Sequence, residues 1–362
     1  MYNGIEIDML SLGDADCILV SFWNGTRAYR VLIDAGNKCD APKVRAFLRG
    51  LNISTVDEVL ATHPHDDHMG GLAELLSDTT LQLGKLWCHI PHLHVESMEK
   101  VNNALRAAGT SEEANRIQKS LETAEAVYGI AQQRQIFLEE PFEGKKIGIL
   151  QVLSPSVGFY EDLVSEFTEP DRIKAEDEAE LRYRIQGAVE EGFAKNGLVE
   201  TGSLLDDPHT SPENESSVVT GFTHAGSTVL FTADAGLCAL TNVIAAYAVA
   251  GLGWMQIPHH GSRRNLNKCL IETFAPKTAF VSAIGNDKHP RRAVVNAFKN
   301  VDTKVYSTHY PSPAHKRFYM GSVPPRVGYI TAVPLWDAKQ LAKAQQDVPS
   351  LADLLLGVAG TR

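Results

Sequence analysis

Short apolar runs and amphipathic stretches alternate near the start of the chain and again between residues 216 and 306. Runs rich in β-branched and aromatic residues predict strands. The early ones lie at residues 5–10, 17–22, 29–33 and 56–62. The stretch 41–51 has the spacing of an amphipathic helix. Strands and helices that alternate in this way predict an α/β fold.

Two polar stretches interrupt this alternation. Residues 95–140 and 157–200 are rich in Glu, Ala, Gln, Lys and Arg and poor in Gly and Pro, so we expect surface helices there. A strand at 146–153 divides them, and an amphipathic helix at 338–356 closes the domain. We predict a single domain over residues 1–362. The two insertions could form a lid, a dimer interface or neither.

Composition limits the possible binding partners and the cellular compartment of the protein. The chain has 44 acidic and 34 basic residues and a formal charge of −10, which argues against a broad nucleic-acid-binding face but leaves room for a local basic groove. The first residues are too acidic for a signal peptide, and no apolar run is long enough to span a membrane. Five scattered cysteines suit free thiols. We expect a cytoplasmic protein without membrane contact.

The most informative segment is Thr-His-Pro-His-Asp-Asp-His-Met-Gly-Gly at residues 62–71. It contains the pattern H-x-H-x-D-H, formed by His63, His65, Asp67 and His68. Three imidazoles and a carboxylate this close together are costly to bury and gain little when exposed, whereas divalent metal ions satisfy them all. The segment lies between an expected strand and an expected helix, where α/β active sites form. The alternative is a solvated loop that happens to be rich in histidine.

Three other segments contain motifs that add to the evidence from this loop. They are Val31-Leu32-Ile33-Asp34-Ala35-Gly36, Val229-Leu230-Phe231-Thr232-Ala233-Asp234-Ala235-Gly236 and Ile257-Pro258-His259-His260-Gly261-Ser262. Together with the H-x-H-x-D-H loop, they resemble the metallo-β-lactamase superfamily. Further details resemble its ComEC/Rec2-like soluble hydrolase branch. These are Leu12-Gly13-Asp14-Ala15, the stretch from Asn214 to Val219, His259-His260-Gly261-Ser262, and Asn286-Asp287-Lys288-His289-Pro290, in which His289 is expected to open a helix.

The resemblance implies the metallo-β-lactamase type of αββα sandwich and two divalent ions, zinc or manganese. By the family's pattern, the first ion is held by His63 and His65, the second by Asp67 and His68, and Asp234 bridges them. One of His259 and His260 completes the second site. The ions would activate a shared water at neutral pH.

Three residues are expected to take part in catalysis. Asp67 holds the second ion, Asp34 accepts a hydrogen bond that orients a ligand imidazole or a bound water, and His289 holds or protonates a leaving phosphate oxygen. For His289, a capping or surface role is an equal alternative. Substrate contacts are expected from Arg263, Arg264, Ser262 and Asn214. Basic residues in these segments are also typical of an ordinary solvated surface.

One departure from the family concerns the first ion. The third histidine that usually precedes the bridging Asp is missing, since His209 is too early and His224 too late. Glu213, Asn214 or a water would complete the site. We therefore predict weak occupancy of the first site and a place there for harder ions such as manganese. The histidines at 89, 92 and 94 are expected to face substrate or solvent more readily than a metal.

Three functions remain open on the sequence. The ComEC-like motifs and the Arg263-Arg264 pair favour a metal-dependent nuclease or phosphodiesterase. The acidic charge favours a hydrolase of a small phosphodiester, a phosphorylcholine-type ester or a lactone. The third is a non-catalytic scaffold that binds a protein partner. The full H-x-H-x-D-H set and Asp234 argue against this scaffold.

Overall fold

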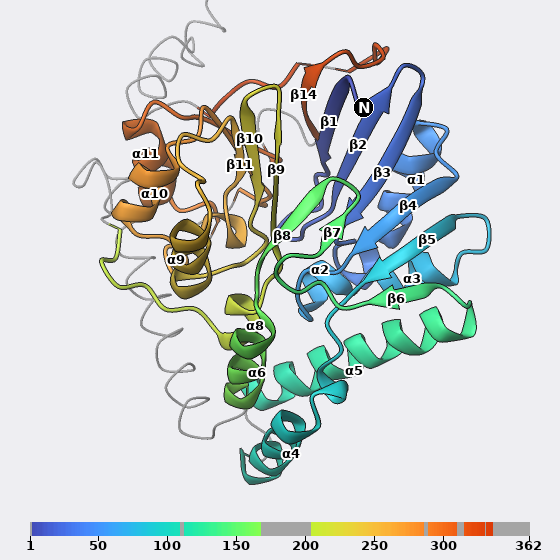
Figure 1. The fold of residues 1–362 in the computed structure, drawn as a ribbon, viewed down its shortest axis with the longest axis vertical. Coiled ribbons are helices and arrows are strands. Elements are labelled where there is room, and N and C mark those ends of the chain that lie inside the picture. The colour runs from blue at the N-terminus through green and yellow to red at the C-terminus, as the bar shows by residue number, and fades with distance from the viewer. Residues whose placement is uncertain are drawn as a thin grey trace, which may run out of the picture.

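The chain forms two seven-stranded sheets stacked face to face, with helices on both outer sides (Figure 1). The computed structural model describes residues 2–108, 112–167, 204–285, 289–309, 315–329 and 331–335. The predicted α/β class and αββα sandwich are confirmed. None of the helices in these ranges is long and apolar enough to cross a bilayer.

The first sheet comes mainly from the N-terminal half. Its order is β14-β1-β2-β3-β4-β5-β6. The strands are β1 (Gly4–Met9), β2 (Ile18–Asn24), β3 (Arg27–Ile33), β4 (Thr55–Leu60), β5 (Gln82–Trp87), β6 (Phe137–Glu139) and β14 (Lys316–Gly321). Strands β1 to β3 pair antiparallel, and β3 to β6 pair parallel.

The second sheet repeats this plan. Its order is β13-β12-β11-β10-β9-β8-β7. The strands are β7 (Lys146–Ile147), β8 (Leu150–Ser154), β9 (Val219–His224), β10 (Ser227–Phe231), β11 (Trp254–Gln256), β12 (Thr278–Val281) and β13 (Lys304–Ser307). Strands β7 to β10 pair antiparallel, and β10 to β13 pair parallel. In both sheets, the loops after the parallel strands therefore open at one edge.

The helices cover the outer faces and the open edge. They are α1 (Ala41–Gly50), α2 (Asp66–Met69), α3 (Leu72–Ser77), α4 (Val95–Ala108), α5 (Glu112–Gln133), α6 (Val157–Glu166), α8 (Pro212–Glu215), α9 (Leu237–Ala246), α10 (Lys268–Phe274) and α11 (Arg292–Asn300). Single 3-10 turns lie at Lys38–Asp40, Pro91–Leu93 and His259–Gly261. The strand expected at 56–62 is β4, and the helix expected at 41–51 is α1.

Apolar side chains fill the space between the two stacked sheets. Aromatic residues from both sheets form the centre of this layer, among them Phe22, Phe231, Trp254 and Phe280. Their rings contact one another; for example, the Phe231 and Trp254 centroids are 5.1 Å apart. This rigid layer holds the two halves together and fixes the spacing of the loops at the open edge.

Where the structure describes them, the predicted insertions are helical except for the strand β6. Residues 95–140 contain α4, α5 and β6, and α5 packs on α3. Helix α5 also reaches the H-x-H-x-D-H loop: the Thr123 hydroxyl donates to Asp66 at 3.1 Å, and Lys119 forms an ion pair with the same carboxylate. Of residues 157–200, only α6 and Phe167 are described. The helix expected at 338–356 lies outside the described residues.

Candidate metal centre

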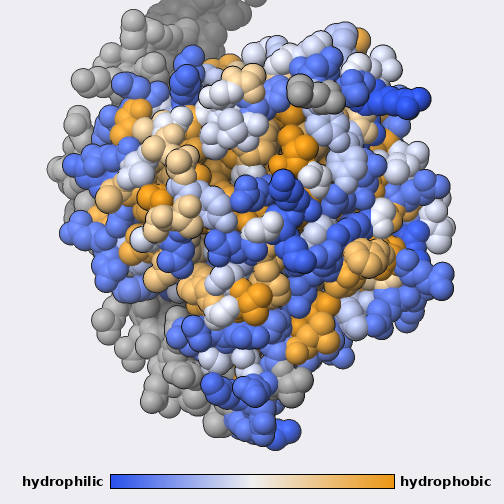
Figure 2. Space-filling model, in the orientation of Figure 1, coloured by the Kyte–Doolittle hydropathy of each residue, from blue (hydrophilic) through white to orange (hydrophobic). Residues whose placement is uncertain are grey.

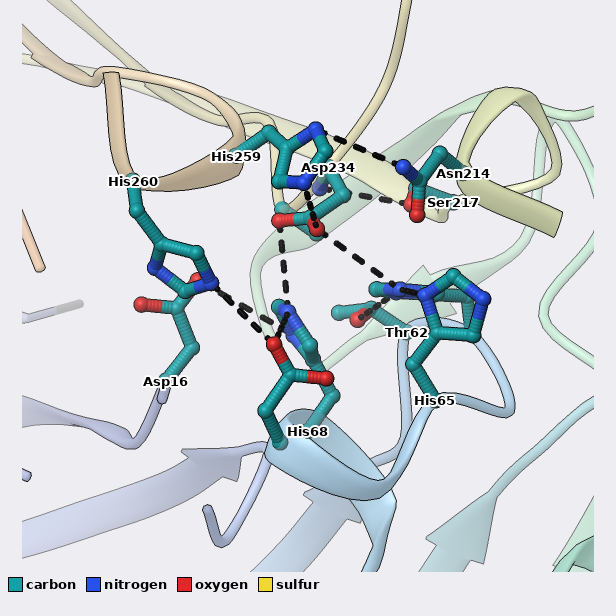
Figure 3. Close-up of polar contacts among 12 residues, drawn as sticks. Asp16, Thr62, His65, His68, Asn214, Ser217, Asp234, His259 and His260 are labelled. Atoms are coloured by element: carbon teal, nitrogen blue, oxygen red, sulfur yellow. Dashed lines mark hydrogen bonds and ion pairs between the residues drawn. The ribbon is translucent and has the colours of Figure 1, made fainter. Parts of the chain in front are cut away.

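Polar side chains from both halves meet at the open edge of the sandwich (Figure 3). The N-terminal half contributes Asp34, which follows β3, and the H-x-H-x-D-H loop between β4 and α3. The C-terminal half contributes Asp234 after β10 and the histidine pair 259–260 after β11. Because these strands are parallel within each half, their carboxyl ends deliver the side chains to one place.

Two groups of possible metal ligands form here and share one carboxylate. The first group is His63, His65 and Asp234, and the second is Asp67, His68, Asp234 and His260. Within each group, the ligand atoms lie within 4.8 Å of one another. The arrangement places Asp234 between two potential ion positions, which is the place that the resemblance implies for it.

The second group has four members, two from each half of the fold. The His68 Nε2 atom lies 3.2 Å from Asp234 Oδ1, and His260 Nε2 lies 3.2 Å from Asp67 Oδ2. Of the histidine pair, it is therefore His260 that joins this group. All four side chains are buried except Asp67, which is partly exposed toward the edge.

The first group has two imidazoles facing each other. The His63 Nε2 atom lies 3.1 Å from His65 Nδ1 and 3.9 Å from Asp234 Oδ2. The His259 Nε2 atom approaches the same Asp234 oxygen to 3.8 Å. His259 is not one of the close group, but it is the third imidazole on this side of Asp234.

The outward-facing ring nitrogens of these histidines have hydrogen-bond partners. His68 Nδ1 lies 2.8 Å from Asp34 Oδ2, His260 Nδ1 lies 3.0 Å from the Ser282 carbonyl, and His259 Nδ1 lies 2.9 Å from Asn265 Oδ1. Each of these oxygens accepts an N–H from Nδ1, which leaves the Nε2 atom turned inward. Metal-binding histidines are held in the same way. The donor set therefore fits divalent ions.

Asp34 acts on both groups at once. Besides His68, its carboxylate accepts hydrogen bonds from the Thr62 backbone N–H at 2.8 Å and the Thr62 hydroxyl at 2.7 Å. The Thr62 hydroxyl lies 3.2 Å from His63 Nδ1, so it accepts that ring N–H. Asp34 has a left-handed backbone with φ of 57°, as have His259 and His260 with 48° and 53°. Such strain gathers at functional sites.

Neighbouring charges shift the pKa values of the side chains in this centre. Burial disfavours the charged form of His68, but the carboxylates of Asp234 and Asp34 outweigh burial and raise its pKa well above the usual value. Burial also opposes ionised Asp67, yet His68 and the hydrogen bond to His260 lower the pKa of Asp67. On the other side, burial and the neighbouring imidazoles lower the pKa of His63. The first group thus offers the neutral imidazole of His63 and the second the ionised carboxylate of Asp67, both of which bind metal, whereas His68 must lose a proton to an ion.

Comparison with known proteins gives a match for the same region. Residues 11–105, which include the H-x-H-x-D-H loop, match the family model of the metallo-β-lactamase superfamily. This match supports a place for the chain in the metallo-β-lactamase superfamily. The observed αββα sandwich of two seven-stranded sheets agrees with this match.

Curated relatives match over a short part of the chain. The chain is 36% identical over 107 residues to the anti-Pycsar protein Apyc1 of Bacillus phage 010DV004, covering 27% of this chain and 39% of that protein. It is 36% identical over 86 residues to ribonuclease Z of Aeropyrum pernix, covering 22% and 26%. The chain thus spans less than half the length of either relative. The solved structure of the metallo-β-lactamase-fold protein YhfI from Bacillus subtilis covers 88% of this chain and 100% of its own, with 10% identity and a TM-score of 0.43.

His289 lies near the candidate metal centre, but it does not stand at the start of a helix. Its ring centroid is 5.5 Å from that of His260, and its Nδ1 is 3.4 Å from Asp14 Oδ2. Helix α11 begins only at Arg292, so the expectation that His289 opens a helix is wrong. The Arg291 N–H donates to the Gly261 carbonyl at 3.1 Å, which keeps the chain extended beside the histidine loop. Residues 286–288 of this motif lie outside the described residues.

Not all of the predicted substrate-binding residues lie at the ligand groups. Asn214, in α8, has its Nδ2 2.8 Å from Thr210 Oγ1 and 3.4 Å from His259 Nδ1, so it lies at the rim of the first group (Figure 3). Arg263 is 3% exposed. Arg264 donates from Nε to the His209 carbonyl at 2.9 Å, while Ser262 Oγ accepts from the Arg264 N–H. Arg263 and Arg264 do not form an exposed basic pair.

The other candidates for the metal sites lie apart from the two groups. Glu213 is buried, and no hydrogen bond to its carboxylate is found among the described residues, but it belongs to neither group. His89 stacks on Tyr160 with centroids 4.2 Å apart. His94 lies between Glu140 and Glu161, at 3.2 and 3.1 Å, and the hydrogen bond to Glu140 raises its pKa.

Replacing Asp34 by Asn is expected to weaken metal binding by about 10- to 100-fold. The amide would lose one acceptor toward Thr62 or His68, so an imidazole could turn away from its ion. Titration calorimetry with zinc chloride measures this affinity. Asp302→Asn is the matched control, because Asp302 is exposed and has a similar φ of 60°. An affinity for zinc equal to that of the wild type would show that Asp34 does not orient the ligands.

Proposed function

We propose that this protein is a metal-dependent hydrolase that cleaves phosphodiester bonds. One observation carries the proposal: two groups of buried histidines and aspartates, drawn from both halves of the fold, share the carboxylate of Asp234. Such a group has little structural use without cations, because it concentrates ionised and ionisable side chains in the interior. When bound, a pair of divalent ions supplies Lewis acidity and a water nucleophile at neutral pH.

The chain's own residues would fix the geometry of this chemistry. Asp67, His68, Asp234 and His260 would hold one ion. His63, His65 and Asp234 would hold the other, with His259 in place of the missing third histidine. His259 suits this role because its Nδ1–H is committed to Asn265 and its Nε2 faces Asp234. Asp34 keeps the ligand rings of His68 and, through Thr62, His63 in position.

His289 is not suited to protonate the leaving group. Burial lowers its pKa to about 4 in spite of the hydrogen bond to Asp14, so at neutral pH it is an uncharged imidazole. A neutral imidazole has one N–H, and Asp14 accepts it, so the other ring nitrogen carries a lone pair. We therefore assign His289 to accepting a hydrogen bond from the substrate or from a water, rather than to protonating a phosphate oxygen.

The ion positions are expected to differ in affinity. The second group brings four ligands together, whereas the close part of the first group has three. After exhaustive dialysis, we expect about one tightly held ion per chain, with the second position filled only when zinc or manganese is added. Inductively coupled plasma mass spectrometry counts the ions. Two zinc ions retained per chain after dialysis would contradict this expectation.

Metal binding is also expected to release protons and to strengthen as pH rises. The hydrogen bond to Asp67 and the carboxylates of Asp234 and Asp16 outweigh burial and raise the pKa of His260 to about 9. An ion must displace this proton, so apparent affinity should climb with pH until about pH 9. Calorimetric titrations at pH 7 in buffers of different ionisation enthalpy measure the release. A heat of binding that does not depend on the buffer would exclude it.

Nucleic acid is the first substrate class to test. The ComEC-like motifs and the match to a ribonuclease support a polymeric phosphodiester. The net charge of −10 and the engagement of Arg264 with the protein backbone favour the second candidate, a small phosphodiester. The zinc- or manganese-loaded protein should be assayed on linear DNA, RNA and bis(p-nitrophenyl) phosphate.

The salt dependence of the cleavage rate distinguishes the two substrate classes. Cleavage of a polymer that makes several phosphate contacts should fall steeply between about 50 and 200 mM salt. Cleavage of the small diester should change little. Activity on none of the three substrates, with the metal shown to be bound, would refute the phosphodiesterase proposal and favour a lactone or another ester. A cytoplasmic location stays a prediction.

A further inference from the structure

Two buried polar side chains connect the halves of the sandwich beside the candidate metal centre. Asp16 lies just before β2, and Gln256 is the last residue of β11. The Gln256 Nε2 amide donates to Asp16 Oδ2 at 2.9 Å. Each residue is only 2% exposed, so water does not compete for this hydrogen bond. Neither residue belongs to the two ligand groups.

On one side, Gln256 holds the turn that carries Asp234. Its side-chain Oε1 accepts hydrogen bonds from the backbone N–H groups of Thr232 at 3.2 Å and Ala233 at 3.1 Å. The Thr232 hydroxyl donates back to the Gln256 carbonyl at 3.0 Å. Ala233 has a left-handed backbone with φ of 46°, which a side chain with a Cβ adopts only when its surroundings enforce it. Gln256 thus helps to fix the conformation from which Asp234 projects.

On the other side, Asp16 holds the loop that carries Asp67 and His68. Its backbone N–H donates to the Asp67 carbonyl at 2.9 Å, and its own carbonyl accepts from the Gly36 N–H at 2.8 Å. Its carboxylate Oδ2 lies 3.9 Å from His68 Nδ1. Figure 3 shows Asp16 next to His260, at the side of the second ligand group.

We propose that Asp16 and Gln256 are a positioning pair that sets the distance between the Asp67–His68 loop and the Asp234 turn. The second ligand group takes Asp67 and His68 from one half and Asp234 and His260 from the other. The pair joins these halves directly, so the four ligands are held close together before an ion binds. This inference rests on the metal centre of the proposed function, not on the identity of its substrate.

The chemistry of the pair explains why an amide faces a carboxylate. Only an amide side chain can accept from two backbone N–H groups through its oxygen while donating to Asp16 through its nitrogen. Gln256→Met keeps a similar side-chain length and removes both functions. Asp16→Asn keeps an acceptor oxygen for the Gln256 amide and removes only the negative charge. The two variants therefore separate the hydrogen-bonded connection from the charge.

The test is titration calorimetry of the metal-free protein with zinc chloride, well below the unfolding temperature. Gln256→Met should bind the tighter zinc ion about 10- to 100-fold more weakly than the wild type. Asp16→Asn, which keeps the hydrogen-bonded connection, should bind it distinctly more tightly than Gln256→Met does. Gln133→Met, an exposed position in α5, is the matched control and should match the wild type. If Gln256→Met does not fold, Gln256→Glu keeps the acceptor, loses the donor and should show the same weakening.

Thermal unfolding of the metal-free variants completes the design. A lower unfolding temperature with unchanged zinc affinity would show a merely structural role and overturn the proposal. Equal weakening in Asp16→Asn and Gln256→Met would also overturn it, because charge and not the connection would then set affinity. A wild-type protein that binds no zinc would remove the centre itself. Zinc binding without phosphodiester cleavage would refute the proposed substrate and leave this test intact.

Discussion

Replacing Asp234 by Asn is expected to reduce hydrolysis by about 1,000-fold or more, because this carboxylate is the one member of both ligand groups. An amide binds divalent ions weakly and carries no charge to offset theirs. A loss of about 4 kcal/mol of transition-state stabilisation, within the several kcal/mol that metal ions supply, corresponds to this factor. Steady-state rates on bis(p-nitrophenyl) phosphate with added zinc or manganese measure it.

Two controls make this result specific. Asp302→Asn changes an exposed aspartate to the same amide and should leave the rate unchanged. Metal content after dialysis should fall in Asp234→Asn but not in Asp302→Asn. An Asp234→Asn protein that retains the wild-type rate would show that the hydrolytic site lies elsewhere.

Removing the metal is expected to lower the free energy of unfolding by about 4 kcal/mol when free zinc is roughly 1,000 times its dissociation constant. Zinc binds the assembled ligands of the folded protein more tightly than those of the unfolded chain. The buried carboxylates of Asp234, Asp34 and Asp16, together with Asp67, also lie close together and are balanced only in part by His68 and His260 without the ion. Denaturant unfolding with zinc and with a chelator measures the difference.

The Asp234→Asn variant serves as the control for this second prediction. Because it lacks the shared ligand, its stability should respond only weakly to zinc. Equal stability of the wild type with zinc and with chelator, combined with no turnover, would favour the non-catalytic scaffold. A stabilised protein without turnover would instead keep the metal centre and leave its substrate open.

The sequence could predict the ligand loop because its ligands are close in the chain. His63, His65, Asp67 and His68 stand within six positions, and short apolar runs on either side gave β4 and α3. The choice between His259 and His260 could not be read from the sequence, because adjacent residues differ only in the direction of their side chains. The left-handed backbone at both positions determines those directions.

Contacts between distant segments left no local signal. Asp16 and Gln256 are separated by 240 positions and meet only because the two sheets stack. Thr62 is similar: it looks like an ordinary strand residue until Asp34 and His63 are seen on either side of its hydroxyl. Pro290 suggested a helix start near His289, whereas the hydrogen bond from Arg291 to Gly261 delays α11.

The most direct test of the account is a crystal structure of the protein soaked in manganese chloride, with anomalous diffraction used to locate the ions. We expect two anomalous peaks on either side of the Asp234 carboxylate, the stronger one among Asp67, His68 and His260 and the weaker one beside His63 and His65. Peaks elsewhere, or no peak at Asp234, would contradict the proposed metal centre and the hydrolase built on it.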